Sequence, residues 1–135
     1  MSYVPRYLLD TNIVSHIIRQ PTGIVVDRIK VEGEHSLCTS IVVAAELRFG
    51  AEKKGSVKLK AQMEAVLSAM NILPLEEPVD RHYAEIRDQL EKQGTPIGPN
   101  DLWIAAQAMA HKLTVVTANT GEFQRVSGLA VENWL

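Results

Sequence analysis

The chain alternates short apolar runs with longer stretches in which apolar residues recur three or four positions apart. Short runs rich in branched residues, bounded by polar residues, Gly or Pro, are typical of buried strands. Apolar residues at the longer spacing line one face of a helix. The runs predict short strands at residues 7–9, 35–39, 72–75, 113–116 and 129–131.

The stretches between these runs are predicted to be helical. We expect helices at residues 12–19, 22–31, 40–49, 57–70, 80–93 and 100–111, the third capped by Ser40 and ending near Gly50. Strands separated by helices need crossover connections, which join parallel strands. The sequence therefore predicts an α/β fold with helices on both faces of a central, mostly parallel sheet of four to five short strands.

Length and composition limit the class of protein. The 135 residues fit one domain, spanning 1–135, and 46% of them are hydrophobic, which is enough to build a core. The 14 basic and 16 acidic residues give a net charge of −2, which argues against a general polycation that coats nucleic acid. Cys38 is the single cysteine, so an internal disulfide and a thiolate zinc cluster are excluded. With no signal-like N-terminus and no apolar run of membrane length, we expect a cytoplasmic protein.

Four acidic residues lie where the predicted fold would form a ligand crevice. Asp10 directly follows the first strand, and Glu122 follows the 113–116 strand through a short loop. Asp101 starts a helix, and Glu46 stands alone in an apolar helix. In open α/β sheets the crevice lies at the carboxyl ends of the strands.

Each acid also has a purely structural interpretation. Asp10 is a good helix cap, Asp101 favours the dipole of its helix, and Glu122 fits a solvated turn. Glu46 fits the wet face of its helix, paired with Arg48 or Arg6. Taken together, the four acids favour a cation site, because carboxylates gathered in one crevice repel one another.

Oxygen ligands suit hard cations such as Mg²⁺ or Mn²⁺. A cation held by carboxylates stabilises charge on phosphoryl oxygens and activates water. These carboxylates and their cation therefore favour hydrolysis of a phosphodiester.

Several motifs, in order along the whole chain, resemble PIN-domain ribonucleases, and most closely the VapC toxins of bacterial type II toxin–antitoxin modules. The motifs are the segments at residues 8–12, 45–50, 97–106 and 117–123 and the tail at 125–134. The resemblance implies a PIN-like three-layer α/β/α fold and a Mg²⁺- or Mn²⁺-dependent endoribonuclease that cleaves structured RNA, either tRNA, including initiator tRNA, or rRNA. It also implies inhibition by a VapB-type antitoxin, a homodimer, and higher hetero-oligomers with the antitoxin.

The resemblance assigns roles residue by residue. It implies that Asp10, Glu46 and Asp101 hold the metal and that Glu122 completes the catalytic set. Thr11, Thr117 and Asn119 would support the site, and whether Asn119 or Glu122 fills the fourth position stays open. The basic stretch after Glu46 supplies the candidate RNA contacts Arg48, Lys53 and Lys54, with a solvated helix face as the alternative.

Two other classes of phosphate-handling protein do not fit the sequence. A receiver-like phosphoacceptor needs a lysine after a late strand, but Lys112 precedes its strand. A haloacid-dehalogenase-type phosphatase needs a second Asp at position 12, where this chain has Asn12. The alternatives that stay open are a PIN-fold module that binds RNA with little or no catalysis and another metal-dependent phosphatase.

Overall fold

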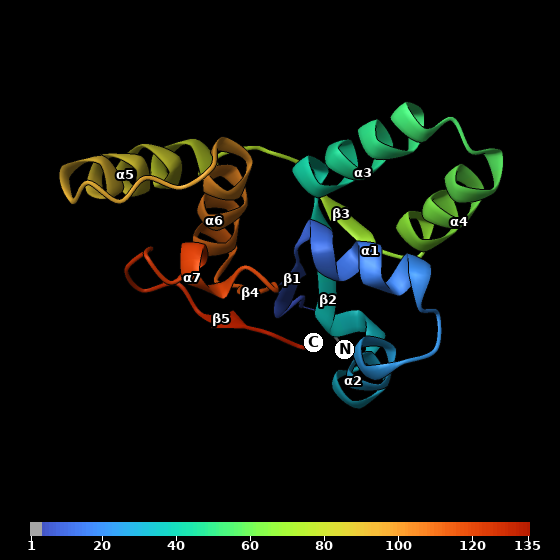
Figure 1. Ribbon diagram of the computed structural model, residues 1–135. Helices are drawn as coiled ribbons and strands as arrows, with labels where there is room; N and C mark the ends of the chain where they lie inside the picture. Colours follow the sequence, from blue (N-terminus) through green and yellow to red (C-terminus); the bar gives the residue numbers. More distant parts are fainter. Residues whose placement is uncertain (1–3) are drawn as a thin grey trace.

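A parallel sheet of five short strands forms the centre of the computed structural model, which describes residues 4–135 (Figure 1). Its order is β3-β2-β1-β4-β5, and each neighbouring pair is parallel. The predicted α/β class and mostly parallel sheet are confirmed. The strands are β1 (Tyr7–Leu9), β2 (Leu37–Ser40), β3 (Asn71–Leu73), β4 (Thr114–Val116) and β5 (Val131–Glu132).

The helices cover both faces of this sheet. Figure 1 shows α1 to α4 gathered to one side of the strands and α5 and α6 packed together on the other. The layers are therefore helix, sheet and helix, as predicted. The helices are α1 (Thr11–Arg19), α2 (Ile24–Glu32), α3 (Ile41–Lys54), α4 (Val57–Ser68), α5 (Val79–Lys92), α6 (Pro99–His111) and α7 (Thr120–Phe123), with a 3₁₀ turn at Glu34–Ser36.

Strand β1 lies at the point where the direction of winding reverses. The chain leaves β1 toward β2 and β3 on one side, and later returns to place β4 and β5 on the other. Leu8 and Leu9 have no exposed surface, so β1 is buried between the helical layers. Ligands of such sheets bind outside the carboxyl ends of the strands at this reversal. The crevice is therefore expected where β1 and β4 end.

Helix α3 is longer than the sequence predicted. It runs through Gly50 to Lys54 and ends where Gly55 adopts a left-handed backbone with φ of 66°. Ala51 is buried in a cluster with Met63 and Leu67 of α4, and this packing offsets the cost of a glycine inside the helix. The prediction that the helix ends near Gly50 is therefore wrong.

Other boundaries differ by at most two residues. The last strand begins at Val131 where the sequence predicted Leu129, and residues 120–123, expected as a loop, form the short helix α7. The predicted strand at 35–39 is displaced because residues 34–36 form a 3₁₀ turn. Strand ends shift easily because a single ladder hydrogen bond decides them.

Cys38 is an inert core thiol. It is fully buried on β2, where its sulfur donates to the backbone carbonyl of Tyr7 at 3.4 Å. Burial raises the pKa of the Cys38 thiol to about 12, so the reactive thiolate is suppressed. Among residues 4–135, we also find no helix with the length and apolar character needed to cross a membrane.

Candidate functional site

Asp10 joins the end of β1 to the start of α1. It is 4% exposed, and its Oδ1 accepts a hydrogen bond of 2.8 Å from the backbone N–H of Thr11. Its Oδ2 accepts from the Thr117 hydroxyl at 2.8 Å and from the Asn12 amide at 3.4 Å. The same carboxylate therefore caps the helix, as the structural interpretation required, and faces the crevice between β1 and β4.

Thr117 connects Asp10 to the other side of the crevice. It follows β4, has no exposed surface, and its backbone N–H donates to the carbonyl of Glu132 at 2.9 Å. Besides donating to Asp10, its hydroxyl accepts from the backbone N–H of Asn119 at 2.9 Å. One buried hydroxyl thus fixes the orientation of Asp10 and the start of the loop that carries Glu122.

Asp101, Asn119 and Glu122 form the second half of the site. Asp101 lies in the first turn of α6, and Glu122 lies in α7. The Asn119 amide donates to Asp101 Oδ2 at 3.4 Å and to Glu122 Oε2 at 2.6 Å. The backbone N–H of Gly98 donates to Glu122 Oε1 at 2.5 Å. Asn119 therefore bridges the two carboxylates.

Glu46 approaches from α3, across the groove from α1. Its Oε1 accepts a hydrogen bond of 3.0 Å from the Thr11 hydroxyl. Thr11 also donates its backbone N–H to Asp10, so this one residue links the two carboxylates. The alternative that Glu46 pairs with Arg48 or Arg6 is wrong. Arg48 forms a two-pronged pair with Glu64 at 3.0 and 3.1 Å, and Arg6 pairs with Glu32 at 3.2 Å.

The carboxylates perturb one another. Burial, followed by the negative charges of Asp10 and Glu122, raises the pKa of Asp101 to about 7. Burial also raises the pKa of Asp10, against the lowering effect of its hydrogen bonds, of which the Thr11 N–H is the strongest. The Gly98 N–H and then the Asn119 amide lower the pKa of Glu122, which also shares a hydrogen bond with Asp101. Near neutral pH Asp101 is therefore partly protonated, because its charged form is buried and repelled by Asp10 and Glu122.

This donor set fits a hard divalent cation. It consists of carboxylate oxygens supported by hydroxyl and amide groups. Burial, and then repulsion by Asp10 and Glu122, raise the pKa of Asp101, and a bound cation would offset both effects. Within residues 4–135, three His, Cys, Asp or Glu side chains are nowhere gathered closely enough to hold an ion by themselves. Mg²⁺ is commonly held by only one or two carboxylates and keeps several waters as ligands. Two carboxylates of this cluster would therefore be enough to hold it.

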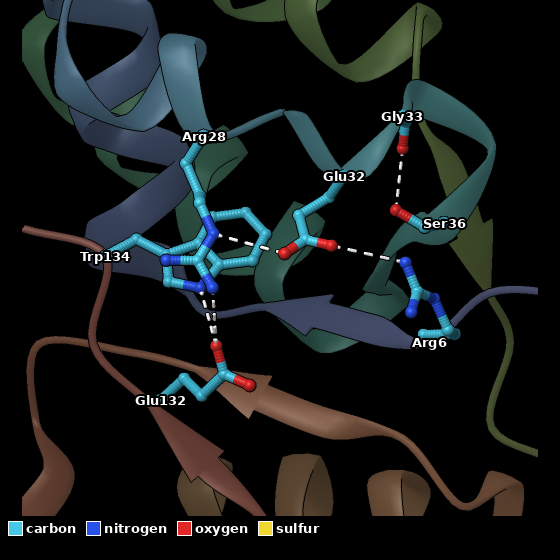
Figure 2. Close-up of polar contacts among 7 residues, drawn as sticks. All are labelled: Arg6, Arg28, Glu32, Gly33, Ser36, Glu132 and Trp134. Carbon is cyan, nitrogen blue, oxygen red and sulfur yellow. Dashed lines mark hydrogen bonds and ion pairs between the residues drawn. The ribbon is translucent and has the colours of Figure 1, made fainter. Parts of the chain in front are cut away.

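A network of charged side chains fastens the last strand to α2 (Figure 2). The Glu132 Oε1 accepts from Arg28 at 3.3 Å and from the Trp134 indole N–H at 3.0 Å. Arg28 also lies 5.1 Å over the Trp134 ring and pairs with Glu32 at 3.2 Å. Because the Glu132 carbonyl holds the Thr117 N–H, this network supports the position of the hydroxyl that contacts Asp10.

Sequence reasoning missed two contributors to the site. The Asn12 Oδ1 accepts the Ala118 N–H at 2.9 Å, which ties α1 to the loop after β4. The Gly98 N–H holds Glu122. Arg48 is engaged by Glu64, whereas Lys53 and Lys54 lie exposed in the last turn of α3. An amide two residues after a site carboxylate was the signal available for Asn12.

The chain is similar to one protein family and to several of its named members. The family described as PIN domain matches residues 7–129. The chain is 37% identical over 131 residues to "Ribonuclease VapC2" of Haemophilus influenzae, covering 96% of this chain and 98% of that protein. It is 36% identical over 130 residues to "tRNA(fMet)-specific endonuclease VapC" of Shigella flexneri, with 96% and 98% covered.

A solved structure shows the same architecture. The crystal structure of DNA-bound VapBC from Salmonella typhimurium contains a chain that superposes with a TM-score of 0.90 at 32% identity, covering 98% of this chain and 100% of that chain. The resemblance predicted from the motifs is confirmed. With its parallel sheet, its acidic crevice and these relatives, the chain belongs to the PIN-domain family, among the VapC ribonucleases.

Proposed function

We propose that this chain is the toxin of a type II toxin–antitoxin module and acts in the cytoplasm. It hydrolyses a phosphodiester bond of structured RNA with Mg²⁺ or Mn²⁺, and initiator tRNA is the first substrate to test, since a relative is named for it. The observation that carries the proposal is the acidic crevice at the reversal of the sheet, where Asp101 has a pKa of about 7. A carboxyl whose pKa is raised by burial and by neighbouring carboxylates is typical of a functional site.

Asp10, Glu46 and Asp101 would hold the cation, directly or through water. When bound, the ion supplies a Lewis acid that stabilises charge on the phosphoryl oxygens and activates water. Thr117 and Thr11 keep Asp10 and Glu46 in fixed orientations through their hydroxyls. Loading the site requires Asp101 to release its proton, so the apparent affinity for the cation should fall as the pH drops below about 7.

Glu46 is the better candidate to orient the attacking water and take its proton. The oxygens of Glu122 are bonded to the Gly98 N–H and to Asn119, whereas Thr11 occupies one oxygen of Glu46. Glu122 and Asn119 then act as a support that holds Asp101 toward the crevice. In this proposal Asn119 and Glu122 share the fourth position, because both support Asp101.

A VapB-type antitoxin segment would occupy the groove between α1, α3 and α4. A cavity of about 180 Å³ lies there, with apolar walls including Ile18, Leu59 and Met63 and with Glu46 among its lining residues. An apolar segment carrying an arginine toward the acids fits this combination of surfaces. Leu59→Lys should weaken antitoxin binding and leave RNA cleavage intact.

We also propose a homodimer, and higher hetero-oligomers with the antitoxin.

Cleavage of RNA by the purified protein tests the proposal. A panel of total RNA, initiator tRNA and ribosomal RNA is incubated with Mg²⁺ or Mn²⁺, with and without EDTA. We expect discrete products with either ion and none with EDTA. Binding of these RNAs without metal-dependent products would instead favour the RNA-binding module, and release of phosphate from monoesters without RNA cleavage would favour a phosphatase.

A further inference from the structure

The loop between α5 and α6 has the acidic site on one side and a second pocket on the other. Gly98, in this loop, donates to Glu122. Pro96 and Pro99, immediately beside it, line a pocket of about 230 Å³ against α5. Asp101 follows Pro99 by two residues at the start of α6. The pocket is therefore separated from the proposed reaction centre by the thickness of one loop.

The pocket has the walls of a binding site for one flat ring. Its floor is apolar, formed by Leu90, Ile97 and Leu102, and Tyr83 forms one side. The Tyr83 ring is held by its neighbours, because it stacks on Trp103 with centroids 3.9 Å apart and planes at 22°, and the Arg87 guanidinium lies 6.0 Å from the Tyr83 centroid. Sites for drug-sized ligands measure about 300–1,000 Å³, so this smaller volume suits one base better than a whole nucleotide.

The rim of the pocket carries the polar groups that a nucleotide needs. Arg87 donates to the Tyr83 hydroxyl at 3.0 Å, and its side chain is 54% exposed. Glu91, 3.6 Å from Arg87, supplies an acceptor. Arg125, which follows α7, donates to the carbonyl of Pro96 in the loop at 3.0 Å. A phosphate entering along the loop would thus meet one arginine on the pocket side and another beside the loop.

We propose that this pocket, defined by Tyr83, Arg87, Leu90, Pro96, Pro99 and Leu102, binds one unstacked base of the RNA within two nucleotides of the cleaved bond. The inference rests on the proposed ribonuclease function and adds a subsite to it. The sequence, with only 5% aromatic residues, showed no stacking platform, but the fold brings Tyr83 and Trp103 together from two helices. Arg87 contributes charge attraction to the adjacent phosphate, and the rings and prolines contribute base stacking.

Abasic substitution tests the pocket in the intact protein. A short RNA that the wild-type protein cleaves is made with one base removed at each position in turn, and KM and kcat are measured with Mn²⁺. One position near the cut should raise KM by roughly 5- to 150-fold, the range for base–aromatic stacking, with little change in kcat. In Tyr83→Ala the intact RNA should already show the raised KM, and removing that base should cost nothing further.

Three variants separate the subsite from an effect on folding. Tyr83→Phe retains the ring and should behave as wild type. Arg87→Gln leaves the stack in place and should raise KM by itself. Arg81→Gln, the matched control, removes the same charge from an exposed position of α5 outside the pocket and should change nothing.

Several results would overturn the subsite. One is an abasic penalty that persists in Tyr83→Ala, and another is a KM that no abasic position changes. A third is weaker antitoxin binding by Tyr83→Ala with unchanged KM, which would assign the pocket to a protein side chain. If the wild-type protein cleaves no RNA, the proposed function fails, and photo-cross-linking of 4-thiouridine RNA in Ca²⁺ decides the pocket separately: a cross-link on Tyr83 supports it and none refutes it.

Discussion

Replacing Thr117 by valine removes one hydroxyl from the centre of the site and leaves the side-chain volume almost unchanged. The hydroxyl donates to the Asp10 carboxylate at 2.8 Å and accepts from the Asn119 N–H at 2.9 Å. Because Thr117 has no exposed surface, water cannot replace either bond without entering the core. The variant isolates the hydrogen bonds from any effect of a cavity.

The structure sets the size of the effect. A hydrogen bond to a charged group contributes about 1.5–3 kcal/mol, and the unpaired Asn119 N–H adds part of a desolvation penalty. We expect Thr117→Val to lower the free energy of unfolding by about 2–4 kcal/mol. Since the Thr117 hydroxyl lowers the pKa of Asp10, its loss also disfavours the carboxylate that would hold the cation. Loss of such a supporting group commonly costs about 10–100-fold in metal affinity or activity.

Two measurements check this prediction. Urea unfolding followed by tryptophan fluorescence gives the stability, and the Mn²⁺ dependence of RNA cleavage gives the apparent metal affinity. Thr114→Val, the same change at the other end of β4 on a half-buried residue, is the matched control. A Thr117→Val protein within about 0.5 kcal/mol of wild type, with unchanged metal dependence, would refute the role assigned to the hydroxyl.

Three further predictions concern charge. In the folded chain the pKa of Asp101 is about 7, whereas in the unfolded chain it has the ordinary value of 3.8. Asp101 therefore raises the metal-free melting temperature at low pH, and this gain is lost as pH rises through about 7. Asp101→Asn should flatten the pH profile of the melting temperature, and Mn²⁺ should reverse its slope. Arg28→Gln should cost up to about 1 kcal/mol in urea unfolding, because its ion pairs are partly exposed, and a loss above about 3 kcal/mol would contradict this. Replacing Lys53 and Lys54 by Gln should lower the salt slope of RNA binding by about one to two, whereas an unchanged slope would exclude both as phosphate contacts.

The position of the site was readable because strand ends are visible in the sequence. The change from apolar to polar residues marks where β1 ends, so Asp10 could be placed at a carboxyl edge. Parallel order then brings the residue after β4 to the same edge, since Leu9 pairs with both Thr39 and Val116. Local pattern and topology are sufficient for this step.

The bonding within the site was not readable. Thr117 contacts Asp10 across 107 positions, and Arg28 reaches Glu132 across 104. These contacts depend on register, helix rotation and side-chain rotamers, none of which leaves a local pattern. The predicted length of α3 was wrong for a related reason. Packing of Ala51 against α4 stabilises the helix beyond Gly50, and this contact also leaves no local pattern.

The central claim is that the carboxylates of the crevice act through a divalent cation on RNA. Its most direct test is single-turnover cleavage of initiator tRNA by wild type, Asp10→Asn and Asp80→Asn across a Mn²⁺ titration; Asp80 is an exposed acid in the first turn of α5 and serves as the matched control. We predict that Asp80→Asn follows the wild-type curve and that Asp10→Asn remains folded but loses at least about 100-fold in rate. Cleavage by Asp10→Asn at the wild-type rate, with the same Mn²⁺ dependence, would contradict the account.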